Sequence, residues 1–216
     1  MKQLFTLLIM LLSIFTLKAQ TETSQNFNKE FGINATNFIN LFLSFNDNFV
    51  GTNNYLLTYK KFKDDGKVLR LGGSIRGNSF VDDPDDDNSN FDKRTTNLFD
   101  LDFRVGSEKQ IPVKGQWSVN FGADAIAGYF FSSSKTDDNK LTLNSIYLGG
   151  GPVAGIQYMI NDRIGLLTEA SFYLTLSTAL SKSSNGGSSS EDSKDKETQL
   201  GFGTSLPSNL IFFVRF

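Results

Sequence analysis

The chain ends in Leu210-Ile211-Phe212-Phe213-Val214-Arg215-Phe216. Successive side chains of a β-strand point to opposite faces, so Leu210, Phe212, Val214 and Phe216 would form one wholly apolar face. In water, an apolar strand edge at a free terminus would promote aggregation, whereas a closed barrel in lipid needs such a face. A soluble sandwich can also end on a buried strand, so the preceding sequence has to distinguish these two folds.

The composition excludes several classes of protein. The 216 residues suffice for one domain, and they include no Cys and no His. The absence of Cys removes disulfides, thiolate catalysis and Cys-based zinc sites together. A formal charge of −2 argues against general nucleic-acid binding, which needs a basic surface.

The first twenty residues have the pattern of a secretory signal. Lys2 precedes an apolar run from Leu4 to Phe15, and Ala19 offers a small residue for cleavage. The alternative, an N-terminal membrane anchor, is disfavoured because the run is short for a bilayer span. We therefore predict a signal peptide over residues 1–19 and a mature domain over 20–216. No later apolar stretch reaches the length of a membrane helix, so the mature chain is either soluble outside the cytoplasm or a membrane barrel.

The alternation of apolar and polar residues is clearest between Asn97 and Val105. One face of this predicted strand carries Phe99, Leu101, Phe103 and Val105, and the other carries Asp100, Asp102 and Arg104. Three charges opposite an unbroken apolar row are typical of a barrel with a wet interior and an oily exterior.

The same period of two continues through most of the chain and predicts eight strands. They cover residues 31–45, 55–62, 68–80, 97–105, 117–131, 146–160, 164–176 and 198–216. Short connections (63–67, 106–115, 161–163) alternate with long or polar ones (46–54, 81–93, 132–140, 181–197), as outer-membrane barrels require. A hairpin at Pro207 would instead give nine strands, so 198–216 should be one bent strand.

Two local features leave alternatives open. Apolar residues between 37 and 45 also fall at helical spacing, so a helix there competes with a strand. Pro152 lies in the middle of a predicted strand, and because proline removes a ladder donor we expect a local bulge.

Aromatic residues mark both ends of the predicted apolar rows. The row that begins at Trp117 ends with Tyr129 and Phe131, and Tyr158 belongs to the neighbouring row. Aromatics at both ends of a lipid-facing strand form the interface girdles of membrane barrels.

Charged residues fall on the faces that would line the barrel. The predicted lumen charges are Lys60, Arg70, Arg76, Asp100, Asp102, Arg104, Asp124, Glu169 and Arg215. An eight-stranded barrel is only wide enough for side chains to fill its interior. We therefore expect an ion-paired plug, with a narrow ion or solute pore as the alternative.

The chain resembles the small eight-stranded outer-membrane barrels of the OmpA/OmpX type, in their single-domain form. The likeness covers nearly all of the mature chain and rests on the signal sequence, the alternating strands and Leu210-x-Phe212-x-Val214-x-Phe216. It implies an all-β, eight-stranded antiparallel up-and-down transmembrane β-barrel in the bacterial outer membrane. It also implies that the barrel assembly machinery reads those four residues. Outer-membrane lipid and lipopolysaccharide are the implied partners, and the loops could bind an extracellular partner.

The sequence offers little for catalysis or metal binding. Barrel enzymes of this kind use His as a base, and this chain has none. The acidic loop carries Asp83, Asp85 and Asp87, but Asn88 and Arg94 replace the Gly and Glu of a calcium loop. We expect a non-enzymatic envelope-structural or surface-interaction protein without cofactor or metal site. The alternative is a soluble, lipocalin-like periplasmic barrel that encloses a small apolar ligand.

Overall fold

A computed structural model describes residues 27–35, 55–82, 93–136, 139–185, 193–205, 207 and 209–216 of the chain. The strands are β1 (Lys29–Asn34), β2 (Leu57–Phe62), β3 (Lys67–Asp82), β4 (Arg94–Lys114), β5 (Trp117–Thr136), β6 (Asn139–Met159), β7 (Ile164–Asn185), β8 (Ser193–Ser205) and β9 (Ile211–Arg215). Within these residues no helix is long and apolar enough to cross a membrane.

The strands form one antiparallel sheet that closes into a ring. Each strand from β1 to β7 pairs with the next, and β9 pairs with both β7 and β1. Because β8 and β9 are both antiparallel to β7, they run in the same direction and form one interrupted strand around Pro207. The hairpin alternative at Pro207 is therefore wrong. The predicted eight-stranded up-and-down barrel is confirmed.

The register fixes the width of the barrel. Paired residues lead from Phe31 through Tyr59, Leu71, Val105, Ala125 and Gly150 to Leu174 of β7. In the other direction Phe31 leads through Val214 to Ile164 of β7, so the path returns ten residues away from Leu174. This stagger of ten over eight strands implies a tilt of about 40° and a lumen that side chains can fill.

Tight turns join the strands at one end of the barrel. Gly66 has a φ of 77° between β2 and β3, and Gly115 has a φ of 60° between β4 and β5, a conformation that glycine adopts without steric cost. In the first turn the Lys67 backbone N–H donates to Asp65 Oδ1 at 3.1 Å. This bond lowers the pKa of the exposed Asp65 carboxyl.

Strands β3 to β7 are longer than the alternation predicts, whereas β1 ends at Asn34 and is shorter than the predicted strand 31–45. β4 to β7 span 20 to 22 residues each, about twice what a tilted strand needs to cross a bilayer. The predicted connections 106–115 and 132–140 are wrong because β4 continues to Lys114 and only residues 137–138 separate β5 from β6. The predicted connection 181–197 is also too long, since β7 reaches Asn185 and β8 begins at Ser193. Ladder hydrogen bonds continue where both faces are polar and the alternation disappears.

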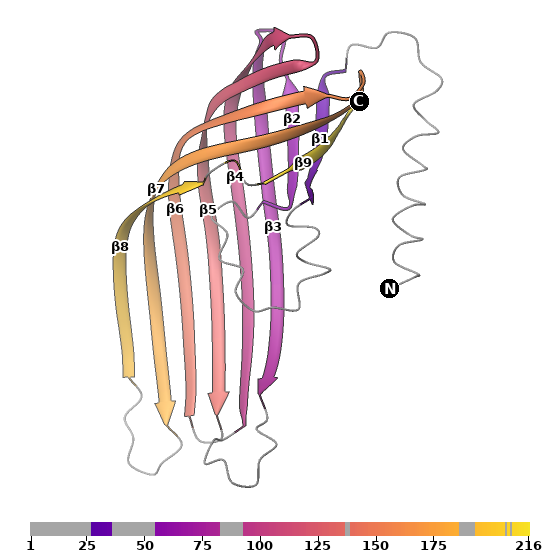
Figure 1. Cartoon of the computed structure of the whole chain (residues 1–216). Coiled ribbons are helices and arrows are strands. Elements are labelled where there is room, and N and C mark those ends of the chain that lie inside the picture. The colour runs from indigo at the N-terminus through magenta and orange to yellow at the C-terminus, as the bar shows by residue number, and fades with distance from the viewer. Residues whose placement is uncertain are drawn as a thin grey trace, which may run out of the picture.

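The extra length forms a second part of the molecule, the projecting sheet. Its six strands, β3 to β8, continue beyond the barrel, away from the short turns and the C-terminus (Figure 1). β2 pairs with β3 only as far as Gly73. Among the described residues, no strand pairs with the β2-side edge of β3 beyond that point, or with the edge of β8 that faces away from β7 between Ser193 and Gly203.

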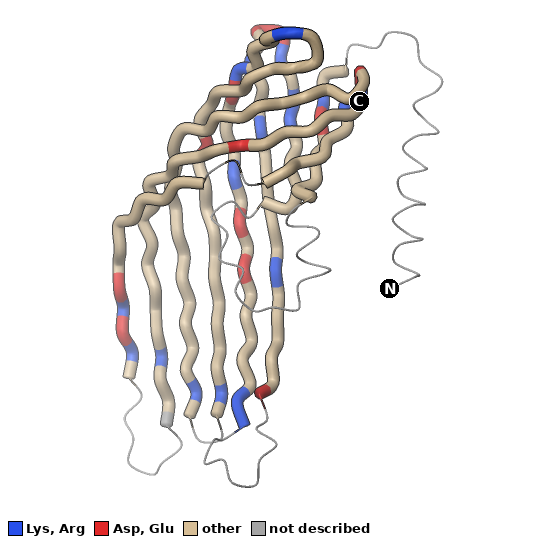
Figure 2. The backbone as a smooth tube through the Cα atoms, viewed as in Figure 1, with Lys and Arg blue, Asp and Glu red and all other residues tan. Residues whose placement is uncertain are grey.

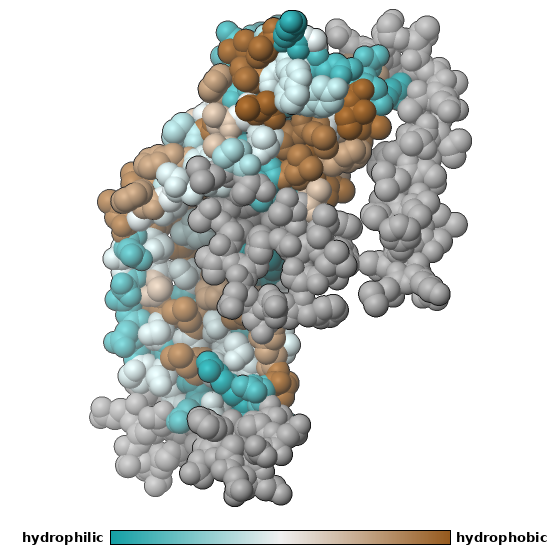
Figure 3. Space-filling model, in the orientation of Figure 1, coloured by the Kyte–Doolittle hydropathy of each residue, from teal (hydrophilic) through white to brown (hydrophobic). Residues whose placement is uncertain are grey.

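The two faces of the barrel wall have opposite chemistry. Outward positions carry exposed apolar side chains, including Ile75, Phe103, Val105, Trp117, Phe121, Ile146, Leu148, Ile156, Phe172, Leu174, Leu176, Leu200 and Phe202. Inward positions hold the buried charges Glu30, Lys60, Arg70, Asp102, Arg104, Glu108, Asp124 and Glu169. Figure 3 shows apolar side chains over the region of β1 and β9 and at the bend of β8, and mainly hydrophilic ones along the rest of β8.

The ladder irregularities differ from the expectation. Pro152 pairs with Ala123, and the register of β6 against β5 is the same on both sides of it. Against β7 the ladder is interrupted at 151–152 and resumes in the same register, so the bulge predicted at Pro152 is wrong. The register shift instead lies between Pro112 and Lys114, at the end of β4 next to the β4–β5 turn.

Three expectations fall on residues that the structure does not describe. They are the signal peptide and its cleavage point, the choice between strand and helix at 37–45, and the carboxylates of the acidic loop at 83–87.

Candidate functional site: the filled lumen

Arg70 is the centre of the lumen and contacts carboxylates from three other strands. Its side chain lies on β3 and is 2% exposed. Nη1 donates to Glu108 of β4 at 2.6 Å and Nη2 to Glu169 of β7 at 2.7 Å. Nε lies 3.1 Å from Asp124 Oδ1 of β5. One guanidinium therefore links four strands across the lumen.

A second set of ion pairs extends toward the short-turn end. Lys60 Nζ of β2 donates to Glu108 Oε1 at 2.6 Å and lies 3.9 Å from Glu30 Oε1 of β1. Arg215 of β9 donates from Nε to Glu30 Oε2 at 3.2 Å. Glu30 and Arg215 are directly opposite each other in the ladder that closes the ring, so this ion pair crosses the seam.

Arg104 of β4 completes the central layer. Its Nη1 donates to Glu169 Oε2 at 2.9 Å, and its guanidinium lies 4.7 Å from the centre of the Tyr55 ring, within the range of a cation–π contact. Tyr173 donates its hydroxyl to Asp124 Oδ2 at 3.0 Å. Each buried charge in this layer thus has an opposite charge or a hydrogen-bond donor.

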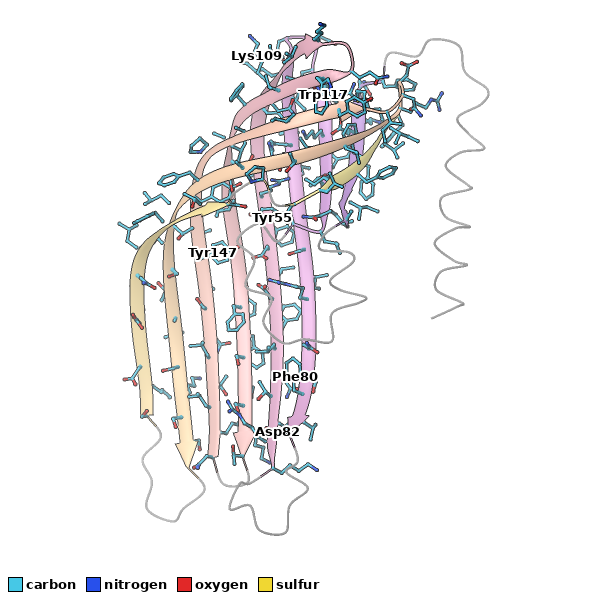
Figure 4. The ribbon with its side chains drawn as sticks, in the orientation of Figure 1. Tyr55, Phe80, Asp82, Lys109, Trp117 and Tyr147 are labelled. Atoms are coloured by element: carbon cyan, nitrogen blue, oxygen red, sulfur yellow. The ribbon has the colours of Figure 1, made fainter. Side chains whose placement is uncertain are left out.

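A third group lies where the barrel meets the projecting sheet. Arg76 pairs with Asp100, and its Nη2 lies 4.0 Å from Asp102 Oδ2. Asp102 also accepts hydrogen bonds from the hydroxyls of Tyr147 and Ser74. Figure 4 labels Tyr55 and Tyr147 at this level, with Phe80 and Asp82 toward the far end of the sheet and Lys109 and Trp117 beside the short turns.

Apolar clusters flank the ion-paired layers inside the lumen. On the side of the projecting sheet, the cluster comprises Tyr55, Ile126, Val153 and Tyr173, with Tyr147 packed against it. On the short-turn side, Leu167, Ile211 and Phe213 form a second cluster with Met159. A hollow of about 410 Å³ opens at that end, and Met159 and Arg215 belong to its lining. The described lumen is therefore filled by ion pairs between two apolar layers.

Glycines on neighbouring strands make room for the large inward side chains. A Cβ at Gly72 would lie 2.6 Å from Arg104 Nε, and a Cβ at Gly128 would overlap the Tyr147 ring. Glycine at these positions lets long or aromatic side chains lie flat against the wall. Gly72 and Gly128 therefore belong to the packing of the lumen.

The structure places all nine predicted lumen charges on inward positions and gives each an ion pair. Sequence reasoning missed two further members, Glu30 and Glu108. Glu108 fell inside the predicted connection 106–115, and Glu30 lay one residue before the predicted strand 31–45. Extending the alternation three residues past Val105 would have placed Glu108 on the same inward face as Arg104.

The predicted interface aromatics lie at two levels of the outward face. Trp117 and Tyr158 are opposite each other near the short turns, with ring centroids 4.8 Å apart. Tyr129 and Phe131 lie at the other end of the β5 apolar row, where the Tyr129 ring is 6.4 Å from that of Phe99. Of the C-terminal row, Leu210 and Phe216 are exposed, and Phe212 and Val214 are half-buried.

The described residues show no metal-binding cluster. No three or more acidic side chains converge among them in a way that could hold a metal ion. The lumen carboxylates are instead directed at Lys and Arg side chains.

Comparisons with known proteins give likenesses to solved structures alone. No family model matches the chain, and no curated protein matches it. The crystal structure of CarO from Acinetobacter baumannii aligns with 88% of this chain and 96% of its own, at a TM-score of 0.38 and 12% identity. A likeness at this level assigns no function to the chain.

The geometry argues against a lipocalin-like barrel. Such a protein encloses an apolar ligand and presents polar residues to water. Here the lumen holds Arg70, Glu108 and Glu169, while Phe103 and Val105 are about half exposed on the outside. The arrangement of polar and apolar faces is the one that lipid requires.

Replacing Arg70 tests the lumen network. Arg70→Met leaves buried carboxylates without their shared cation, so we expect a loss of unfolding free energy of about 3–5 kcal/mol. Urea unfolding in lipid vesicles measures it. A second variant, Arg70→Met with Glu108→Gln, should recover part of the loss because it removes one uncompensated charge.

The matched control is Lys67→Met, which removes an exposed ion pair with Asp65, 3.5 Å long. This change should cost about 0–1 kcal/mol. Equal losses for the Arg70 and Lys67 variants would show that the lumen network contributes no more to stability than a surface ion pair.

Proposed function

We propose that the chain is a non-enzymatic bacterial outer-membrane barrel whose role is surface interaction, carried out by the projecting sheet. The observation that carries this proposal is the division of the molecule into a barrel with a filled lumen and six strands that continue beyond its apolar band. A filled lumen supports anchoring rather than transport. The ends of the long strands place polar surface beyond the last outward apolar side chains.

The orientation follows from the two ends of the barrel. Short turns and the C-terminus lie at one end, and the projecting sheet at the other (Figure 1). In outer-membrane barrels short turns face the periplasm and longer elements face outward. We assign the projecting sheet to the cell surface accordingly, in contact with outer-membrane lipid and lipopolysaccharide at its base.

The C-terminal strand is assigned a role in biogenesis. Leu210, Phe212, Val214 and Phe216 lie on the outward face of β9 and its flanks, and β9 closes the ring against β1. An outward aromatic row on the closing strand supports its recognition by the barrel assembly machinery. The signal peptide at 1–19 would deliver the chain for this step.

Site-specific labelling of intact cells tests the proposed placement. Since the chain has no Cys, single cysteines report one position each. Ser184→Cys on the projecting sheet should react with a membrane-impermeant maleimide in intact cells, and Gln116→Cys in the β4–β5 turn only after permeabilisation. Both side chains are exposed in the fold. The side of the membrane on which each cysteine lies therefore decides whether the reagent reaches it. Labelling of both, or of neither, in intact cells would contradict the outer-membrane placement.

Planar-bilayer recording tests the closed lumen. The purified chain should give no stable unitary conductance, because ion-paired side chains and two apolar layers occupy the lumen. A stable, large unitary conductance would show that the network opens and would replace the anchoring role by that of a pore.

A further inference from the structure

Five lysines form a cluster on the outward face of the projecting sheet, which we name the lysine belt. Its members are Lys135 of β5, Lys140 of β6, Lys182 of β7, and Lys194 and Lys196 of β8. All five are exposed. Figure 2 shows basic residues gathered at the far ends of these four strands. By the strict alternation of the pleat, they share the face of the apolar residues Phe131, Ile146, Leu180 and Leu200.

The lysines are close neighbours. Lys135 is directly opposite Lys140, and Lys182 is directly opposite Lys194. Lys140 is the diagonal neighbour of Lys182, because its own partner is Ser184. Opposite residues have Cβ atoms about 4.5–5.5 Å apart, and like charges at that distance are destabilising. The belt therefore carries a repulsion that an anion would relieve.

Among the residues that the structure describes, no acidic side chain compensates the belt on its own face. The carboxylates of the same region, such as Asp195 and Glu197, alternate with Lys194 and Lys196 and so point to the opposite face. Within the described part of the chain, none of the five lysines makes an ion pair. Positive charge is thus segregated onto the outward face.

Protection of sheet edges does not explain this arrangement. Lysines often guard exposed edge strands, but Lys135, Lys140 and Lys182 lie on β5, β6 and β7, which are paired on both sides. A second copy of the chain is also disfavoured. Two β8 strands paired about a two-fold axis at Asp195 would set Lys194 opposite Lys196 and Asp195 opposite itself, and an axis at Lys194 or Lys196 would set that lysine opposite its own copy.

The height of the belt indicates its partner. Lys135 lies four residues beyond Phe131, Lys196 four residues beyond Leu200, and Lys182 two residues beyond Leu180. At about 3.3 Å per residue and a tilt of about 40°, these steps place the ammonium groups roughly 5–10 Å above the apolar band. Headgroup phosphates occupy that level of a bilayer.

We infer that the lysine belt binds the phosphate groups of the outer-leaflet lipids that surround the barrel. The inference rests on the proposed outer-membrane placement and names the surface that contacts the lipid headgroups. Clustered lysines next to a membrane surface attract anionic lipid at about a fivefold gain in affinity per residue. Bound phosphates would neutralise the opposed lysines and hold the projecting sheet upright on the membrane.

Native mass spectrometry of the full chain in detergent tests the inference, with bis-phosphorylated lipid A and its mono-phosphorylated form as probes. The wild type should prefer the bis-phosphorylated form. The variant with Lys135, Lys140, Lys182, Lys194 and Lys196 all changed to Gln should bind it more weakly by about tenfold or more and lose the preference. Heat-dependent gel mobility shows that the variant is folded.

The matched control changes Lys61, Lys63, Lys67, Lys109 and Lys114 to Gln, which removes the same charge from exposed positions near the short turns. It should bind both probes as the wild type does. Unchanged binding by the belt variant, or an equal loss by the control, would overturn the inference. So would a belt variant that loses binding to soluble dextran sulfate but keeps lipid A. The labelling of Ser184→Cys in intact cells is independent of all these results and reports the membrane placement separately.

Discussion

The pairing of β1 with β9 is the interaction on which the rest of the fold depends. Lys29 and Phe216 exchange both backbone hydrogen bonds, at 3.1 and 2.9 Å, and the ladder continues to Asn34 and Ile211. Without it, β1 and β9 would each have an edge of unpaired N–H and C=O groups, and each such group would cost several kcal/mol in the lipid environment that we propose. Closure of eight strands with a stagger of ten also sets the diameter of the lumen.

A narrow closed lumen explains the network of charges. If the outward face contacts lipid, as we propose, the pleat places every second side chain in the lumen, which holds no bulk water. Arg70, Glu108 and Glu169 neutralise one another there, and apolar layers around Tyr173 and Phe213 fill the remainder. Since these side chains occupy the interior, the surface that we propose for interaction is the projecting sheet, whose outward face is basic at its far end.

Strong periodicity made the barrel and most of its lumen predictable from sequence. Phe99 to Val105 alternate without a break, so the inward placement of Asp100, Asp102 and Arg104 followed from the pleat alone. The strand ends could not be predicted, because Ser132 to Thr136 and Thr178 to Ser184 are largely polar on both faces. Backbone hydrogen bonds hold these segments in the sheet, and such bonds leave no pattern in the amino-acid sequence. Glu108 was lost for a related reason, since Pro112 and Gly115 suggested an earlier turn. The lysine belt could be recognised only when the registers set Lys135 beside Lys140.

Solution NMR in micelles tests the closure of the ring most directly. Lys29 and Phe216 form a hydrogen-bonded pair, so by alternation Gly32 and Phe213 form a non-hydrogen-bonded pair with Cα atoms about 4.5 Å apart. The closed barrel predicts an Hα–Hα nuclear Overhauser effect between Gly32 and Phe213, together with slow exchange of the β1 amides. Absence of this cross-peak, with fast exchange along β1 and β9, would contradict the closed barrel.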